Sequence, residues 1–484
     1  MSGRSLARVT LTLAFVSALA GSSLAEAPAP MPTPAPAATP VPAPAATPAP
    51  APDPEPSRLE LLEAQVGALQ RENRSLQAAV QAIPSPAPGP QIKVGGQVRL
   101  RPEHRDRLKP DANGGTSDTF IGQRARANVT VSTERLRAFV EVQDARNWGT
   151  EVSTVSNDNN IDLHQAYITL PDLFRKGAAL SVGRQELAYG DERLLGAADW
   201  LTAARSFDGA VARYAWKSGM VDALGALVND RKTAARGVGD MVLSGAYGRF
   251  LRGKPGRELD LYLLNVNDGA SSAGELTGKD DSRFTTTGAR ARYGKPTGVQ
   301  VSAEAAYQSG HKGPDDHEAY AWALTGGYIF DVALRPGLRI EWDRASGDTP
   351  KDGKSGEFNN LFPTNHAFYG YADLLGWRNM NALRGTVSVA PRAGHTLSLD
   401  LHHFQLLEAK GAWKDAGGEV LGQDPTGKAG RDIGDELDLL YRFPVRKDIT
   451  ALAGYSAFFP GRFAESVGRT KTQSFGYAQV LFKF

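Results

Sequence analysis

Arginines alternate with apolar residues in several stretches of the chain, so that in an extended strand they share one face. Arg99 and Arg101, for example, alternate with Val98 and Leu100. A guanidinium stays charged at any relevant pH and binds carboxylates or phosphates through two parallel hydrogen bonds. A ring of such groups around a pore selects anions. The spacing therefore favours binding of an anionic solute.

Successive residues of a strand point to opposite faces, so the odd or even position of a residue (its parity) assigns it to a face. The arginines assigned to the polar face are Arg99, Arg101, Arg124, Arg126, Arg137, Arg184, Arg213, Arg290, Arg292, Arg339 and Arg384. Carboxylates share the face: Glu141, Glu186, Glu258, Asp260, Glu304, Glu341, Asp343, Asp400, Glu436 and Asp438. Ion pairs between the two sets would leave surplus guanidinium groups for a solute. Alternatively, the arginines only pair with the carboxylates and fill space. Alternation gives the face but not the height along a pore.

The elements that must position these residues are β-strands, because polar and apolar residues alternate with period two from Gln91 to Phe484. Eight short turns are predicted near residues 133–134, 171–177, 217–219, 252–256, 295–298, 331–337, 391–394 and 445–448. Nine longer connections are predicted at 106–119, 147–162, 191–206, 230–239, 269–284, 310–318, 348–378, 408–432 and 460–472. Together they predict an all-β, antiparallel, up-and-down transmembrane barrel of about 18 strands over residues 91–484, with 16 as the nearest alternative.

Composition agrees with a water-filled barrel better than with soluble sandwich domains, which would need denser apolar runs. The chain has 484 residues, of which 41% are hydrophobic, and it has no cysteine. The net charge of +2 gives no bias towards nucleic acid. Residues 1–25 carry two arginines, a short apolar run and small residues before Glu26, which predicts a secretory signal peptide. We therefore expect a bacterial outer-membrane protein whose two barrel ends lie on the periplasmic side.

Two further segments precede the barrel. Residues 26–56 are mostly alanine and proline, which predicts a semi-rigid periplasmic spacer that could contact peptidoglycan. Residues 57–83 predict a short coiled-coil helix. Its a and d positions are Leu59, Leu62, Val66, Leu69, Asn73, Leu76, Val80 and Ile83. Homo-oligomerisation through this helix and a solitary amphipathic helix are equally compatible with the pattern.

Three separated segments resemble the bacterial outer-membrane alginate export family. They are VGRQELAYGDERLLGAADWLTAARSFDG (182–209), NNLFPTNHAFYGYADLLGWRNMNALR (359–384) and DLHHFQLLEAKGAWKDAGGEVLGQD (400–424). The resemblance implies an 18-stranded barrel whose positively charged constriction passes an anionic polysaccharide outward. It points to Arg184, Arg193, Arg205 and Arg384, with Arg193 and Arg205 in a loop that could fold into the channel. The spacer and heptads instead look like the arms of trimeric, phosphate-type porins.

Other chemistry finds little support in the sequence. His402 and His403 are neighbours in a strand and point to opposite faces, so they cannot readily ligate one metal. Two groups of acidic residues could bind calcium through oxygen ligands. They are Asp158 with Asp162, and Asp315 with Asp316 and Glu318. Neither group has the spacing of a known calcium loop. We find no convincing nucleophile and base pair. The sequence predicts no enzyme, no cofactor and no metal.

The function predicted is passive conduction of an alginate-like or related anionic saccharide through an arginine-lined pore. The candidate pore residues are Arg99, Arg101, Arg124, Arg126, Arg184, Arg193, Arg205, Arg290, Arg339, Arg384, Glu141, Glu341 and Asp343. A general or small-anion uptake porin and a barrel that tethers the membrane to the cell wall are the alternatives. Outer-membrane lipid, the anionic solute and periplasmic export proteins are the expected partners.

Overall fold

The computed structural model describes residues 58–82, 89–106, 117–150, 161–229, 239–276, 278–350 and 352–484. The chain divides into two units, Met1–Ser85 and Pro86–Phe484. The signal peptide and spacer predicted at 1–25 and 26–56 lie outside the described residues. Within the described part, no helix combines the length and hydropathy needed to cross a bilayer.

The first unit contains helix α1, Arg58–Ala82. The apolar side chains of Val66, Leu69 and Leu76 are each more than half exposed in the single chain. Exposed apolar residues at heptad spacing are what a coiled-coil partner would cover. Self-association of this helix stays a prediction.

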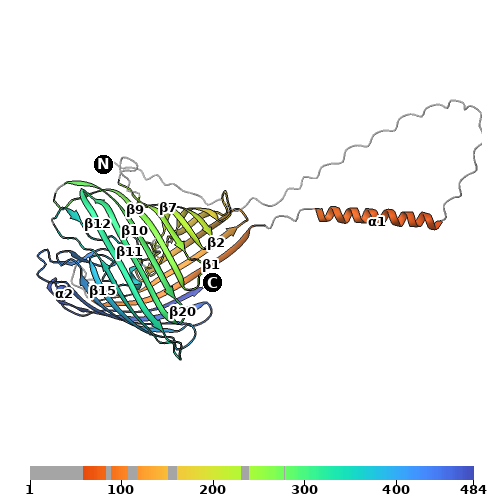
Figure 1. The fold of residues 1–484 in the computed structure, drawn as a ribbon. Helices are drawn as coiled ribbons and strands as arrows, with labels where there is room; N and C mark the ends of the chain where they lie inside the picture. Colours follow the sequence, from red (N-terminus) through yellow and green to blue (C-terminus); the bar gives the residue numbers. More distant parts are fainter. Residues whose placement is uncertain are drawn as a thin grey trace, which may run out of the picture. The chain divides into compact units, whose positions relative to one another are not determined.

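The second unit is a closed antiparallel β-barrel of 18 strands, which confirms the predicted fold class and excludes 16 strands (Figure 1). Each strand pairs with the next along the chain, and the last pairs with the first. The strands are β1 Gln91–Asp106, β2 Ser117–Ser132, β3 Arg137–Asn147, β4 Ile161–Leu170, β5 Ala178–Gln185, β6 Phe207–Trp216, β7 Gly219–Asn229, β8 Met241–Phe250, β9 Arg257–Ala273, β10 Lys279–Gly294, β11 Gly298–Lys312, β12 Asp315–Ile329, β13 Gly337–Ala345, β15 Met380–Val389, β16 Thr396–Leu406, β19 Asp432–Pro444, β20 Ile449–Pro460 and β21 Gln473–Lys483.

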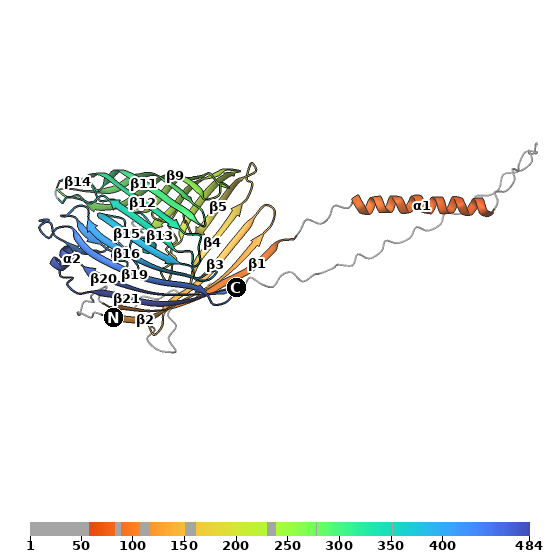
Figure 2. The same cartoon turned by 60° about the horizontal axis from the view of Figure 1, so that its bottom comes forward.

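Short elements lie in the connections between these strands. They are β14 Lys354–Ser355, η1 Asn365–Ala367, β17 Ala412–Lys414, β18 Val420–Gln423 and α2 Arg462–Ser466. β14 adds to the edge of β12, and β17 and β18 form a separate hairpin. The tilted strands surround the interior in the view of Figure 2.

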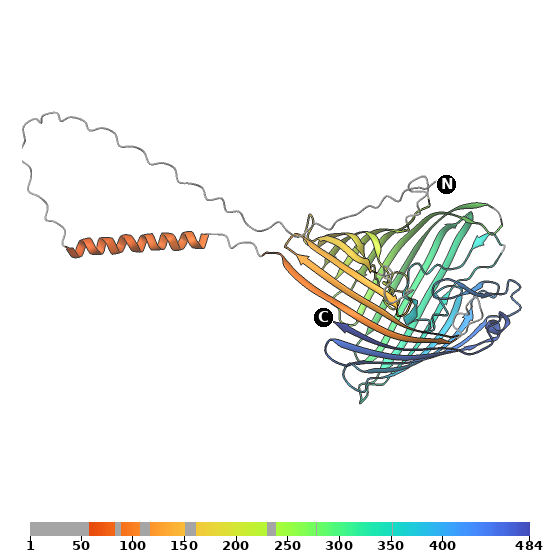
Figure 3. The same ribbon diagram turned by 180° about the vertical axis from the view of Figure 1, so that it is seen from behind.

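The two rims of the barrel differ in their connections. All eight predicted short turns join strands at one rim, the turn rim, and the other nine connections lie at the opposite rim, the loop rim. Both barrel ends lie at the turn rim, where the Gly96 N–H donates to the Phe484 carbonyl at 3.1 Å and β21 runs beside β1 (Figure 3). In outer-membrane barrels short turns face the periplasm.

Two predicted loops are mostly strand. The segment 269–284 belongs to β9 and β10 except for residues 274–278, and 310–318 belongs to β11 and β12 except for residues 313–314. Their polar composition suggested loops. The backbone groups of Ser282 and Lys312 nevertheless pair across β10 and β11. Strands that extend past the lipid need no apolar face, so alternation disappears while pairing continues.

The outer and inner faces carry opposite side-chain types. Ile92, Ile340 and Leu401 are more than half exposed on the outer face, as lipid contact requires. The interior holds the arginines and carboxylates, together with an apolar core. Wall side chains form this core with connections from the loop rim, chiefly the third loop (residues 186–206), the seventh loop (346–379) and the eighth loop (407–431). Trp377 and Trp413 are fully buried there, and the Trp413 indole N–H donates to the Leu374 carbonyl at 2.8 Å.

Candidate functional site

The third loop turns into the barrel immediately after β5. The Glu192 N–H donates to the Tyr189 carbonyl at 2.9 Å, which closes a tight turn around Gly190. Gly190 has a positive φ of 60°, and a Cβ there would lie 2.7 Å from the Tyr247 hydroxyl. Only glycine fits this turn without strain. The turn brings Asp191 to within 2.6 Å of the buried Arg290 guanidinium.

Arg290 belongs to a buried ion-pair network on the barrel wall. Besides Asp191, its guanidinium contacts Asp260 and Glu258, each at 2.9 Å. The three carboxylates accept from both terminal nitrogens of the guanidinium and fix its orientation. Arg290 therefore anchors the start of the third loop to β9 and β10.

Wall arginines on β1 and β2 hold the far end of the same loop. Arg99 donates to the carbonyls of Asp199 and Leu201 at 2.6 and 2.8 Å. Arg124 forms an ion pair with the Asp199 carboxylate at 2.9 Å. Arg101 donates to the Trp200 carbonyl at 2.7 Å and to Glu103 at 2.5 Å. These arginines bind the loop rather than open solvent.

Arg126 and Glu141 form a further part of this wall. Arg126 donates to the Gln143 side-chain oxygen at 2.7 Å and lies 3.7 Å from Glu141. Glu141 also accepts from the Asn128 amide at 3.2 Å. Both charged side chains are buried, so their hydrogen bonds are what make burial tolerable.

Arg193, in the third loop, is buried in the interior. Its guanidinium forms ion pairs with Glu341 at 2.6 Å and Asp343 at 3.2 Å, both on β13, and donates to the Tyr369 hydroxyl at 2.8 Å. The Phe368 ring lies 3.9 Å from it. All three charged side chains are at most 4% exposed. Arg193 thus joins the third and seventh loops to the barrel wall.

Arg205 binds the backbone of both loops. It donates to the carbonyls of Gly196 at 3.0 Å and Pro363 at 3.1 Å, and to that of Phe362. Burial lowers the pKa of Arg205, because water is excluded from its charged form. The same loops also meet through a bridge between Leu195 and Phe362.

An open chamber of about 650 Å³, the turn-side chamber, lies towards the turn rim. Its charged lining consists of Arg193, Arg292, Arg339, Arg384, Arg442, Asp191, Glu341 and Asp400, which is five arginines against three carboxylates. Arg384 is paired with Asp400 at 3.0 Å, and Arg339 donates to the Thr386 hydroxyl at 3.4 Å. Among the described residues, Arg292, Arg339 and Arg442 form no ion pair. The surplus positive charge is therefore concentrated here.

A second chamber of about 530 Å³, the loop-side chamber, lies towards the loop rim. Its charged lining consists of Arg101, Arg105, Arg205, Glu103, Asp373, Asp415 and Glu419, so that carboxylates outnumber arginines by four to three. Tyr371 lines both chambers. Burial raises the pKa of this tyrosine to about 12, so its hydroxyl stays protonated and neutral.

The prediction that Arg184 faces the interior is wrong. Arg184 shares the outward parity of the exposed Val182, whereas Gln185 points inward and is buried. Arg184 pairs instead with Asp208 at 2.9 Å, an acidic partner on the outer face of the neighbouring strand. Assigning polar residues to the lumen failed here because an ion pair lets two charged side chains neutralise each other outside. The third loop also begins at residue 186, not at 191.

The structure places the other candidate pore residues inside the barrel, but in two different settings. Arg99, Arg101, Arg124, Arg126, Arg193, Arg205 and Arg290 hold loops, and Glu141, Glu341 and Asp343 balance them. Only Arg101, Arg193, Arg205, Arg339, Arg384 and Glu341 among the candidates line a chamber. Arg105 and Arg442 were not among the predicted residues, although they share the strand face of Arg101 and Asp438 respectively.

The two predicted histidine neighbours do lie on opposite faces. His402 is buried inside, 3.2 Å from Asp438, and His403 is exposed outside, 2.8 Å from Asp435. Of the acidic groups considered for calcium, Asp158 lies outside the described residues. Asp315 accepts the backbone N–H of Glu275 at 2.8 Å, which is a structural contact between the start of β12 and the β9–β10 connection.

Solved structures with the same architecture are outer-membrane proteins. OccD3 (OpdP) of Pseudomonas aeruginosa aligns with a TM-score of 0.53 and 13% identity over 84% of this chain and 97% of that chain. OpdK of Pseudomonas aeruginosa and OccAB4 of Acinetobacter baumannii each align with a TM-score of 0.52 and 11% identity over 81% of this chain and 98% of theirs. At this identity the likeness shows the fold alone.

The sequence comparisons are more specific. A search of curated proteins gave no match. The sequence profile of the family described as alginate export matches residues 91–477, which is nearly the whole barrel. Together with the closed 18-stranded architecture and its outer-membrane structural neighbours, this match shows that the chain belongs to the alginate export family of outer-membrane β-barrels.

Proposed function

We propose that this barrel conducts an anionic polysaccharide of the alginate type, or a related anionic saccharide, by passive diffusion, and that the solute binds first in the turn-side chamber. The observation that supports the proposal is the excess of five arginines over three carboxylates in that chamber. In an outer-membrane barrel this chamber faces the periplasm, where an exported polymer would enter. The proposal includes no catalytic step.

The turn-side chamber is small enough for its excess of arginines to act on a solute anywhere inside it. A sphere of about 650 Å³ has a radius of roughly 5 Å, which is shorter than the screening length of about 8 Å at physiological ionic strength. Salt therefore does not screen opposite walls of the chamber from a solute at its centre. A carboxylate there would interact with all five guanidinium groups at once.

The uncharged lining suits a saccharide. Hydroxyl groups of Ser302, Thr325, Thr386, Ser388, Thr396 and Ser398 line the same chamber. A hydroxyl both donates and accepts, so it can pair with a sugar hydroxyl in either sense. Arg339 and Arg442 supply planar donor groups for the carboxylate of a uronic acid. Charge selects the acid, and the hydroxyls select the sugar.

The third and seventh loops separate the two chambers around Arg193 and Tyr371. Passage of a polymer then requires these loops to move aside. Their ion pairs with the wall are interactions that a polyanion can replace, because its carboxylates compete with Glu341 for Arg193. The driving force for export comes from other proteins of the envelope.

Planar bilayer recordings on the purified protein test the proposal. We expect anion selectivity and block by acidic oligouronates at least tenfold stronger than by neutral oligosaccharides of equal length. The double variant Arg292→Gln and Arg339→Gln should lose most of that preference. Arg184→Gln, on the outer face, is the matched control and should behave as wild type. Cation selectivity, or equal block by acidic and neutral oligomers, would contradict the proposal.

A small-anion uptake porin is the second candidate. The observation that favours it is the loop packing, because chambers of about 530 and 650 Å³ are of the size that encloses a small ligand. If the protein is a small-anion porin, channel block by acidic oligouronates should not strengthen with oligomer length. Monomeric uronate should then pass through the channel in a liposome assay. Block that strengthens with each added residue favours the polysaccharide.

A further inference from the structure

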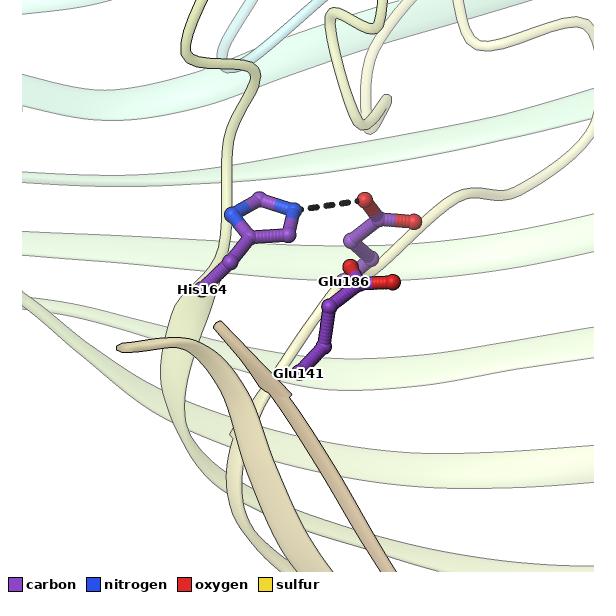
Figure 4. Close-up of side chains that lie close together, drawn as sticks. All are labelled: Glu141, His164 and Glu186. Carbon is purple, nitrogen blue, oxygen red and sulfur yellow. Dashed lines mark hydrogen bonds and ion pairs between the residues drawn. The ribbon is translucent and has the colours of Figure 1, made fainter. Parts of the chain in front are cut away.

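Three side chains with metal-binding atoms meet inside the barrel, at the point where the third loop leaves the wall. They are Glu141 of β3, His164 of β4 and Glu186, the first residue after β5. Their ligand atoms all lie within 4.8 Å of one another. Figure 4 shows the His164 imidazole facing the Glu186 carboxylate, with Glu141 beside it. The first two side chains are buried, and Glu186 is partly exposed.

A β-bulge aims His164 at the two carboxylates. The register between β3 and β4 shifts between Glu141 and Val142, so that His164 has no partner across the strand pair. Leu163 before it remains exposed on the outer face, while His164 is only 2% exposed inside. Bulges re-aim side chains and recur beside functional sites. Without the bulge, His164 and Gln165 would point to opposite faces.

Neighbouring amides hold the Glu141 carboxylate and the backbone of Glu186 in place. Gln165 donates to one oxygen of Glu141 at 3.4 Å, and Asn128 donates to the other at 3.2 Å. The side-chain oxygen of Gln165 accepts the backbone N–H of Glu186 at 3.1 Å. Such outer partners orient ligands in metal sites.

We propose that Glu141, His164 and Glu186 form a binding site for Zn²⁺ or a similar first-row divalent cation. One imidazole nitrogen and two carboxylates, with water in the fourth position, are a ligand set that zinc accepts, whereas calcium and magnesium prefer oxygen alone. Ligand atoms on a tetrahedral zinc lie roughly 3.4 Å apart. The His164 to Glu186 contact of 2.8 Å therefore opens slightly, and Glu141 approaches.

Arg126 is the competitor for this site. Its guanidinium lies 3.4 Å from Glu186 and 3.7 Å from Glu141, while its shortest bond, of 2.7 Å, goes to Gln143. The contacts to the two glutamates are thus its weaker ones, and a divalent cation can displace them. A site that competes with a fixed positive charge binds zinc more weakly than the same site without it.

The cation can reach the site from the turn rim. Glu186 lines a pocket of about 290 Å³ together with Arg137, Thr169 and Arg213, which lie near the turn-rim ends of their strands. Bound metal would connect β3, β4 and the root of the third loop. It would therefore stabilise the loop that carries Arg193.

Isothermal titration of the metal-free protein in detergent with ZnCl₂ tests the proposal. We expect one equivalent of zinc, with affinity at least tenfold weaker in Glu141→Gln, His164→Gln and Glu186→Gln. His403→Gln, which removes an exposed histidine on the outer face, is the matched control and should bind as wild type. X-ray absorption of the zinc complex should show one imidazole ligand and oxygen ligands.

Arg126→Gln distinguishes a metal site from a structural ion-pair network. If the three residues bind zinc, this variant binds it at least threefold more tightly than wild type, a gain that misfolding cannot produce. Circular dichroism confirms that each variant is folded. No zinc uptake by the wild type, or equal uptake by wild type and His164→Gln, would overturn the proposal. Neither result bears on the selectivity for anions, which is measured without metal.

Discussion

The turn-side and loop-side chambers are both lined by arginines, but the arginines have different neighbours. In the turn-side chamber, Arg292, Arg339 and Arg442 line the open space and form no ion pair among the described residues. In the loop-side chamber, Arg101 and Arg105 share Glu103, at 2.5 and 2.6 Å. The same residue type therefore supplies net charge at one end of the barrel and structural contacts at the other.

The difference follows from where the loops pack. The third loop presents backbone carbonyls and Asp199 to the β1–β2 wall, and the arginines there donate to them. Near the turn rim no turn enters the barrel among the described residues, so Arg292, Arg339 and Arg442 have no loop partner, although Arg384 still donates to the Ala367 carbonyl of the seventh loop at 2.9 Å. A count of inward arginines thus overestimates a pore's positive charge, because guanidinium groups that bind loops do not face the solute.

Arg193→Met should have the largest effect on this arrangement. It leaves Glu341 and Asp343 buried without their partner, and breaking a buried ion pair costs roughly 3–5 kcal/mol. The loops should move away so that water reaches these carboxylates. We expect single-channel conductance to rise several-fold and the anion preference to fall, measured by bilayer recordings and reversal potentials.

Arg184→Met is the control for that substitution. It also removes an arginine from an ion pair, but on the outer face and in partial contact with solvent. Its conductance and reversal potential should equal those of the wild type. If Arg193→Met also leaves the conductance unchanged, the two chambers are not separated by this contact.

Glu103→Gln should make the chambers more alike. Glu103 is the shared partner of Arg101 and Arg105, so its neutralisation gives the loop-side chamber as many arginines as carboxylates. Because one negative charge is removed from the lining, we expect acidic oligosaccharide added from the loop side to block roughly fivefold more strongly, which corresponds to about 1 kcal/mol. Block from the turn side should not change, and an equal change from both sides would show that the chambers act as one.

Much of the barrel could be predicted from the sequence, because alternation and turn chemistry are local. All eight short turns and the number of strands agree with the structure. The lengths of β9 to β12 were underestimated, since strands beyond the lipid lose their apolar face. The bulge at His164 had a visible signal: apolar residues occupy 161 and 163 and then 166, 168 and 170, so the parity changes at His164 and Gln165.

The division of the arginines between loops and chambers could not be predicted in this way. The ion pair of Arg193 with Glu341 joins residues 148 positions apart, and the bond of Arg99 to the Asp199 carbonyl spans 100. Parity places a side chain on a face, but the partner comes from a loop whose path depends on the packing of Trp377, Trp413 and their neighbours. Such contacts are decided by the tertiary fold.

Trp200→Ala should loosen only the loop-side chamber. The Arg101 guanidinium lies 3.9 Å from the Trp200 ring, and the His366 ring stacks on it at 3.8 Å. Loss of a cation–π contact costs about 0.5–2 kcal/mol. We expect hydrogen exchange to quicken in residues 196–205 but not around Asp191, which Arg290 holds. Faster exchange along the whole third loop would mean that its two ends are not held independently.

The smallest effect should come from pH at the loop rim. Burial raises the pKa of Asp348 to about 6, and the neighbouring Glu275 carboxylate adds to the shift. Because the folded-state pKa lies above the unfolded value, the protonated form stabilises the contact at low pH. This stabilisation is lost as the pH rises through about 6.

The contact joins the seventh loop to the β9–β10 hairpin, where Glu275 also accepts the N–H groups of Asp352 and Gly353 at 3.0 and 3.1 Å. We therefore expect exchange in residues 346–357 to be faster at pH 7.5 than at pH 5.5, after correction for the intrinsic rate. Asp348→Asn should abolish the difference, because a neutral amide does not repel Glu275 at either pH. Channel block by acidic oligosaccharide added from the turn side should not change stepwise near pH 6, since Asp348 does not line the turn-side chamber. A step from both sides would mean that the loop-rim contact also controls the periplasmic entrance, and the two chambers would then be coupled through the seventh loop.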